Sequence, residues 1–180
     1  FDYPRGQTDV KNTWDGTTGI RLDTTLSRLL FALRFGDFNL LISDQVTRDS
    51  QILLHRSLGD RLPLIAPFLR YDADPYPALL EGRIVWLMDA YTTTTRYPYG
   101  QRVDRDRIAQ SSGLNHDFNY VRNSVKATVD AYDGTVTFYV MDTDDPIIDA
   151  YRQAFPELFT DGEDMPAELR SHLRYPEDLF

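Results

Sequence analysis

The sequence predicts an α+β domain in which an antiparallel β-sheet built on two hairpins packs with about four helices. Leucines near the start of the chain recur at the three- and four-residue spacing of a helix. Two strand-like stretches in the middle each contain a turn pair ending in glycine, Glu81-Gly82 and Asp133-Gly134. Helical patterns return after residue 145. Because helices come first, strands next and helices last, the strands are expected to pair with one another rather than to alternate with helices.

Composition is that of a globular domain. A chain of 180 residues with 42% apolar and 13% aromatic content can form a real core, so we expect residues 1–180 to be a single soluble domain. The net charge of −9 argues against a surface for nucleic acid or anionic membrane. The absence of cysteine excludes disulfides, thiolate nucleophiles and zinc-thiolate sites. No apolar run approaches the ~18 residues that span a bilayer, and the abrupt ends suggest a fragment excised from a larger protein.

The first half of the chain predicts little regular structure over residues 1–21 and then two helices. The first helix begins at a capping Asp/Thr pair after residue 22 and ends at Gly36, which offers a left-handed stop. Its apolar stripe is Leu26, Leu29, Leu30 and Leu33. The second helix is predicted to follow Thr47 and to end at Pro63, because proline cannot donate a backbone hydrogen bond. It would carry Ile52, Leu54, Leu58 and Leu62.

The middle of the chain predicts the sheet. An extended segment, Pro67–Pro77, leads into a hairpin whose second strand, Arg83–Tyr91, is apolar on both sides and therefore covered on both faces. The clearest hairpin is Val125–Met141, with Asp133-Gly134 as a type I′ turn that would pair Val129 with Phe138. Its core face would hold Val125, Ala127, Val129, Ala131, Val136, Phe138 and Val140. Its wet face would hold Lys126, Thr128, Asp130, Thr135 and Thr137.

Two further helices and one long loop complete the prediction. Asp145-Pro146 supplies an N-cap and a first-turn proline for a helix that buries Ile147, Ile148, Tyr151, Ala154 and Phe155. A last short helix, Pro166–Leu173, would pack through Leu169 and Leu173. The polar segment Thr95–Asn119 offers few apolar side chains and no sustained period, so we expect a mobile surface loop. If it proves packed, it becomes the best candidate for a binding site.

Two acidic clusters could supply oxygen ligands to calcium or magnesium: Asp72 with Asp74, and Asp142 with Asp144 and Asp145. Neither cluster has the spacing of a calcium-binding loop, and each lies next to a proline, where aspartate commonly caps a helix or a turn. Capping is the favoured interpretation. The sequence predicts no metal site and no cofactor.

The remaining candidates for chemistry are single residues. The three histidines, His55, His116 and His172, are far apart in sequence, and no nucleophile-elbow, phosphate-loop or zinc-protease motif accompanies them. A structural role is favoured for each. The string Tyr91–Gly100 places hydroxyls and phenols beside Arg96, which suits sugar or anion contact, but β propensity alone explains its threonines. We therefore predict no catalytic residue.

Several longer strings carry a resemblance to a known family. They are Ile65–Leu69, Asp72–Tyr76, Trp86–Thr93, Tyr97–Tyr99, Arg122–Gly134 and His172–Phe180. Together they make the chain resemble an uncharacterised bacterial multi-pass membrane protein family of unknown function (UPF class, number one-eight-two), over nearly its whole length. The resemblance implies an N-terminal bundle of transmembrane helices followed by a long soluble region that contains this chain. It implies no activity, cofactor or catalytic residue, and the polar insert Arg102–His116 departs from it.

From these observations we expect a non-enzymatic extracytoplasmic domain of a cell-membrane protein, serving binding or assembly. Its expected partner is the remainder of its own membrane-embedded chain, without nucleic acid and without insertion of this fragment into the bilayer. The oligomeric state is left open. The alternative is a hydrolase or carbohydrate-active domain of the cell envelope that uses paired carboxylates. A metal-dependent domain is a third possibility.

Overall fold

The computed structural model describes residues 3–10, 14, 16 and 18–179, and the chain divides into two compact units. The first unit is Phe1–Leu54 and the second is His55–Phe180. Each is described by itself below. That the two form the single domain expected from length stays a prediction. Within the described part of the chain, no helix is long and apolar enough to cross a bilayer.

The first unit consists of short elements. Strand β1 (Tyr3–Arg5) pairs with β2 (Thr8–Val10), and β3 (Ile20–Arg21) pairs with β4 (Gln51–Ile52), both antiparallel. Between β3 and β4 lie α1 (Thr25–Phe35) and α2 (Asn39–Ile42). The predicted caps of the first helix are confirmed, with the Thr24 hydroxyl accepting from the Ser27 N–H and Gly36 at φ 66°.

The predicted second helix is wrong at its start. Residues 51–52 form strand β4 beside β3, and the helix, α3, begins only at Leu58 and runs to Ile65. The helical spacing of leucines from residue 52 onward therefore spans two different elements. Pro63 lies inside α3 and does not end it. A proline this close to the end of a short helix removes one hydrogen bond, and the Ala66 N–H still donates to the Leu62 carbonyl.

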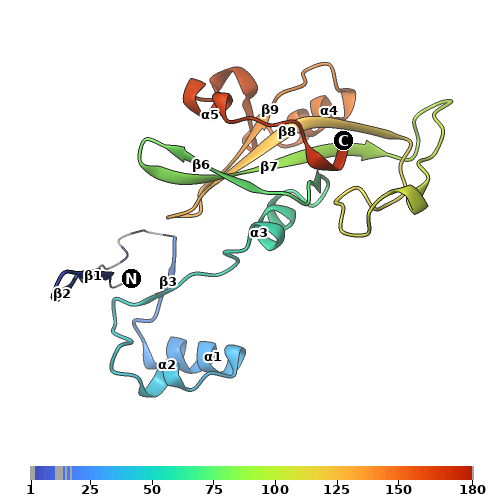
Figure 1. Ribbon diagram of the computed structural model, residues 1–180. Coiled ribbons are helices and arrows are strands. Elements are labelled where there is room, and N and C mark those ends of the chain that lie inside the picture. The colour runs from blue at the N-terminus through green and yellow to red at the C-terminus, as the bar shows by residue number, and fades with distance from the viewer. Residues whose placement is uncertain (1–2, 11–13, 15, 17, 180) are drawn as a thin grey trace. The chain divides into compact units, whose positions relative to one another are not determined.

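The second unit is built around a six-stranded sheet, in which long strands β7 (Arg83–Thr94) and β8 (Tyr120–Asp130) lie at the centre (Figure 1). On the far side of β8 come β9 (Val136–Val140) and then β10 (Phe159–Asp161). On the far side of β7 lie β5 (Arg70–Tyr71) and β6 (Tyr76–Leu80). Every pair is antiparallel except β10 with β9, which the sequence did not reveal. The predicted α+β class is confirmed.

The β8–β9 hairpin has the predicted faces but not the predicted pairing. Val129 pairs with Val136 and Ala127 with Phe138, so the register is shifted by two residues from a two-residue turn. The Ala131 N–H donates to the Ile84 carbonyl of β7 instead of joining the β8–β9 ladder. Because a shift of two preserves the alternation of side chains, Val125, Ala127, Val129, Phe138 and Val140 are all buried.

One face of the sheet carries the main core. The apolar side chains of β8 and β9 pack there with Met88 and Ala90 of β7, and with Leu62 of α3. Helix α4 (Pro146–Ala154) adds Ile148, which is 1% exposed, and begins at the predicted Asp145 cap. Phe155, predicted to be buried, is 46% exposed.

The opposite face, predicted to be wet, is covered. Helix α5 (Ala167–Ser171) and the residues around it place Met165, Leu169 and Leu173 against Val85 and Leu87 of β7. Two polar side chains of the predicted wet face, Lys126 and Thr128, are therefore buried. The Lys126 ammonium forms an ion pair with Asp89 on the adjacent strand, which is also buried. The alternation in β8 could not show that a distant C-terminal segment crosses this face.

A β-bulge interrupts the β7–β8 ladder between Ala90 and Thr92. Beyond it, the Thr92 and Ser124 hydroxyls both donate to the Asp145 carboxylate, which is fully buried. The Tyr120 hydroxyl donates to the same carboxylate at 2.8 Å, and burial with this contact raises the pKa of Tyr120 to about 12. Burial opposes ionisation of Asp145, but these hydrogen bonds hold its pKa below the ordinary value. Asp145 thus ties α4 to both central strands.

Candidate functional site

The segment Thr95–Asn119, which extends beyond the ends of β7 and β8 (Figure 1), is packed. Leu114 and Phe118 are buried against Tyr91 of β7, and Val103 and Ile108 pack on this small cluster. The expectation that this loop buries little apolar surface is therefore wrong. Its four apolar side chains, although scattered in sequence, pack around the buried Tyr91 ring. The sequence predicts that this loop, if it is packed, is the best candidate for a binding site, and it is packed. Its mobility stays a prediction.

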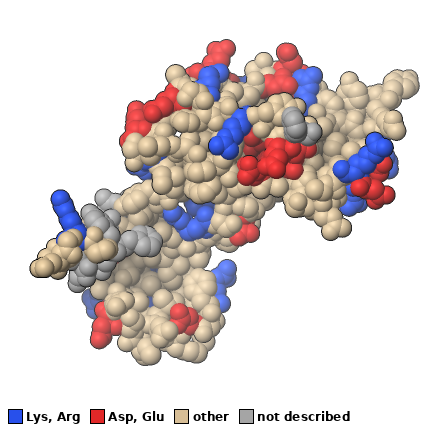
Figure 2. Space-filling view, in the orientation of Figure 1, with Lys and Arg blue, Asp and Glu red and all other residues tan. Residues whose placement is uncertain are grey.

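One wall of a cavity of about 460 Å³ is formed by this loop. The cavity is lined by three stretches that are distant in sequence, residues 72–74, 107–112 and 177–178. The last of these lies in the 3-10 helix η3 (Glu177–Leu179). Four carboxylates line it: Asp72, Asp74, Glu177 and Asp178. Figure 2 shows acidic side chains gathered on the visible face of the second unit. We call this cavity the acidic cleft.

Two of its carboxylates hold the fold together. Asp72 is 3% exposed and accepts hydrogen bonds from the Tyr91 hydroxyl, the Asp74 N–H at 2.9 Å and the Asp178 N–H at 3.1 Å. The Asp178 carboxylate accepts from the N–H of Gly113 at 2.9 Å and of Ala73 at 3.1 Å. These contacts lock the loop, the β5–β6 connection and the C-terminal segment together.

Gly113 explains how the loop approaches so closely. A Cβ atom at this position would lie 1.6 Å from the Tyr71 carbonyl oxygen, so only glycine fits. The Tyr71 hydroxyl in turn donates to the carbonyls of Leu62 and Ala66, and burial raises its pKa. Tyr71, which directly precedes the cleft residue Asp72, is therefore connected to the C-terminal end of α3.

The other two carboxylates, Asp74 and Glu177, are exposed and available for chemistry. Repulsion from the Asp74 charge, with slight desolvation adding to it, raises the pKa of Glu177. Two neighbouring exposed carboxyls of this kind can hold a proton or accept hydrogen bonds from a ligand.

Three of the five acidic residues considered as possible metal ligands, Asp72, Asp142 and Asp145, accept hydrogen bonds within the protein. Asp72 accepts from its own turn, and Asp145 accepts from the Ile147 N–H as the cap of α4. Asp142 pairs with Arg122 at 2.8 Å and accepts from the Asp144 N–H at 3.0 Å. Over the described residues, no group of three or more His, Asp or Glu side chains is arranged to hold a metal ion.

The histidines lie in three separate settings. His55 has a φ of 50° and its carbonyl accepts from Arg61. The His116 ring contacts the Thr93 hydroxyl at 3.1 Å, and burial lowers its pKa, with nearby Arg70 adding to the effect. His172 ends α5. Sequence reasoning missed Glu177 and Asp178, since their position beside Asp72 depends on contacts across most of the unit.

Three hydroxyls of the Tyr91–Gly100 string are used inside the protein. Tyr91 binds Asp72, Thr92 binds Asp145 and Thr93 binds His116. Tyr97 stacks on Tyr120 with ring centroids 5.1 Å apart. Strand β7 extends to Thr94, so the threonines up to that residue lie in a strand, as their β propensity indicates, although this strand is central in the sheet.

Comparison with known proteins gives a family but no activity. The family model described as "Uncharacterised protein family (UPF0182)" matches residues 1–180. A UPF0182 protein of Pelotomaculum thermopropionicum is 46% identical over 180 residues, which are 100% of this chain and 18% of that protein. A UPF0182 protein of Bradyrhizobium diazoefficiens is 47% identical with the same coverage. The chain thus spans about 18% of the length of these relatives. No solved structure matches it.

Proposed function

The chain belongs to the uncharacterised protein family UPF0182, and from that premise we propose that it is a non-enzymatic, extracytoplasmic binding or assembly domain of a larger integral membrane protein. In this proposal the remainder of the same polypeptide is its partner. Neither nucleic acid nor direct insertion of this region into the bilayer is part of the proposal.

The observation that carries the proposal is the apolar surface of the first unit. Large apolar side chains on and beside α1 and α2 are exposed: Leu26 65%, Leu29 40%, Leu30 58%, Leu33 60%, Phe35 49%, Phe38 57% and Ile42 76%. We call these seven side chains the α1–α2 surface. The stripe that the sequence predicts as the buried face of a helix is the stripe that lies exposed.

The first unit has little core with which to stabilise itself. Among its described residues, Leu22 and Ala32 are the buried apolar side chains. Units of about this size are marginal even with a complete core. Contiguous exposed apolar side chains on this scale mark interaction sites. The relatives are more than five times longer than this chain, so another segment of the same polypeptide could cover the α1–α2 surface.

A photo-crosslinking amino acid at Leu30 in the full-length membrane protein tests the assembly role. We expect a crosslink within the same polypeptide, outside the region that corresponds to residues 1–180. The same probe at Arg48, which is exposed in the same unit, serves as the matched control. Equal crosslinking at both positions, or none at Leu30, would contradict the proposal.

The side of the membrane is tested separately. Because the chain has no cysteine, Ser111→Cys in the exposed part of the loop introduces a single thiol into this region. In a full-length protein freed of other cysteines, a membrane-impermeant maleimide should label this thiol in intact cells. Labelling that requires permeabilised cells would place the domain in the cytoplasm.

The Asp74–Glu177 pair supports a second candidate, a cell-envelope hydrolase, because a carboxyl with a raised pKa beside a second carboxylate can act as a general acid. Release of soluble fragments from purified cell-wall material by the full-length protein, abolished by Glu177→Gln, would establish hydrolysis. We expect no release.

A further inference from the structure

A second cavity lies wholly within the first unit, apart from the α1–α2 surface. Its volume is about 600 Å³, and it is lined by Trp14, by the 45–51 stretch and by Leu53. From its geometry we propose that this cavity binds a neutral saccharide, with one sugar ring stacked on the Trp14 indole. The proposal names a ligand site that the assembly role does not require.

Two glycines permit close backbone approaches to side chains that line the cavity. A Cβ atom on Gly16 would lie 2.2 Å from the Trp14 ring, so the indole packs directly over this backbone. A Cβ atom on Gly19 would lie 2.7 Å from the side-chain oxygen of Gln51. Gln51 is itself held in strand β4 by its pairing with Arg21. The aromatic ring and the amide are therefore set by the backbone.

The hydroxyls of the cavity are also fixed. The Thr47 N–H donates to the Ser50 hydroxyl at 3.0 Å, and the Ser50 N–H donates to the Thr47 carbonyl at 3.2 Å. Both residues of this tight turn line the cavity, and their hydroxyl oxygens lie 3.4 Å apart. Gln45 and Asp49, both exposed, add an amide and a carboxylate.

The chemistry of the wall selects the ligand. A sugar ring offers an apolar C–H face, which packs on the electron-rich face of an indole, and a rim of hydroxyls that hydrogen-bond to planar amides and carboxylates. The described lining residues include one carboxylate, Asp49, and no lysine or arginine, which favours an uncharged ligand over an anion. A single exposed aspartate is too little to select a cation. An uncharged, hydroxylated ligand fits all of these groups, and the volume accommodates one or two rings.

The chain contains two tryptophans, Trp14 and Trp86, which makes the test direct. In a nitrogen-15 NMR spectrum of the 180-residue chain, dispersed backbone amide signals first establish that the chain is folded without the rest of the protein. Each indole N–H then gives one signal, and Trp14→Phe identifies which is which. Maltose and N,N′-diacetylchitobiose are added at millimolar concentration. We expect the Trp14 signal to shift and saturate with at least one of them, while the signal of Trp86, which lies on β7 in the second unit, stays in place.

Variants locate the contact. Asp49→Asn and Gln45→Ala should each weaken binding about tenfold, the loss expected for one hydrogen bond to a charged group or an oriented amide. Asp44→Asn, an exposed neighbour outside the lining, should leave binding unchanged. No shift of the Trp14 signal with either saccharide would overturn the proposal. A shift of equal size in the Asp49 and Gln45 variants would overturn it as well.

Discussion

The two hairpin turns of the sheet both place glycine in the left-handed region, but different groups fix them. At the β6–β7 turn, Glu81 and Gly82 have φ of 49° and 80°, and Leu80 pairs directly with Arg83. That is the two-residue, type I′ geometry. At the β8–β9 turn only Gly134 has a positive φ, 78°, and the connection is longer.

A carboxylate upstream of the second turn accounts for the difference. The Asp130 side chain accepts from the N–H groups of Tyr132 at 2.8 Å and Asp133 at 3.1 Å, which fold the chain before the Asp-Gly pair is reached. Arg83 then bridges Asp130 and Asp133 at 2.8 and 3.1 Å. An Asp-Gly pair thus indicates where glycine is needed, but not which residues pair across the turn.

The largest loss of stability is expected from a core substitution, and comparing it with the turn variants shows whether the core or the turn sets the hairpin register. Phe138 is 1% exposed and pairs with Ala127, so Phe138→Ala should cost about 3–5 kcal/mol in the free energy of unfolding. A urea melt measures this cost. If it is smaller than the cost of every turn variant below, the turn rather than the core sets the register of the hairpin.

The two glycines can be compared directly. Gly134→Val should cost about 1–3 kcal/mol from backbone strain, with an added clash because a Cβ would lie 2.5 Å from the Arg61 guanidinium. At Gly82 a Cβ meets nothing within 4 Å, so Gly82→Val should show the strain alone. Adding Arg61→Ala to each variant should reduce the difference between them. Equal costs without that change would mean that Arg61 simply moves aside.

The turns should also differ in their response to acid. Hydrogen bonds from Arg83 and the backbone hold the pKa of Asp130 below its usual value, and backbone N–H donation does the same for Asp133. A lowered folded-state pKa gives stability that is present above the unfolded pKa near 4 and is lost as the pH falls through the folded value. Asp130→Asn should therefore destabilise by about 1 kcal/mol at pH 7 and less at pH 2. Denaturant melts at pH 7 and pH 2 measure this loss of unfolding free energy. The same loss at both pH values would mean that the shape of the side chain matters and its charge does not.

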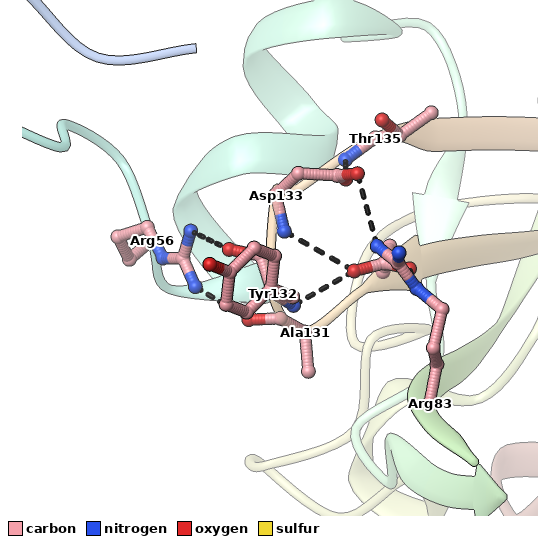
Figure 3. A network of polar contacts seen from close by, with 7 residues as sticks. Arg56, Arg83, Ala131, Tyr132, Asp133 and Thr135 are labelled. Carbon is pink, nitrogen blue, oxygen red and sulfur yellow. Dashed lines mark hydrogen bonds and ion pairs between the residues drawn. The ribbon is translucent and has the colours of Figure 1, made fainter. Parts of the chain in front are cut away.

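The smallest expected effect concerns Arg56. Its guanidinium donates to the carbonyls of Ala131 at 2.5 Å and Tyr132 at 3.0 Å, on the outside of the second turn (Figure 3). Because the site is exposed, Arg56→Ala should cost only about 0.5–1 kcal/mol. Arg56→Lys is the control for charge without the planar fork. A cost above that of Gly134→Val would show that Arg56 holds the turn in place.

Local signals in the sequence predicted local structure well. The Thr24 and Asp145 caps, the Gly36 stop and the apolar face of the β8–β9 hairpin each depend on residues a few positions apart. A pairing shift of two residues leaves that face unchanged, which is why the face was right and the register wrong.

What could not be predicted depends on distant contacts. Lys126 alternates as a surface residue, and only the segment after Gly162 makes its position buried. Asp72 was recognised as a turn residue, but nothing near it in sequence indicates that Glu177 and Asp178 lie beside it. The α1–α2 stripe was correctly identified as apolar, but its side chains are exposed in the structure, and nothing within the stripe indicates what would cover them.

The closing of the second sheet face by α5 has a consequence for synthesis. A ribosome releases β7 and β8 well before Met165 and Leu169 emerge, so Val85, Leu87 and the Asp89–Lys126 pair first meet water on a nascent chain. In that interval the two charges remain hydrated. The uncovered sheet face exposes apolar side chains to which chaperones and other nascent chains can bind. Docking of α5 then expels this water, and the ion pair becomes desolvated only in the last step of folding.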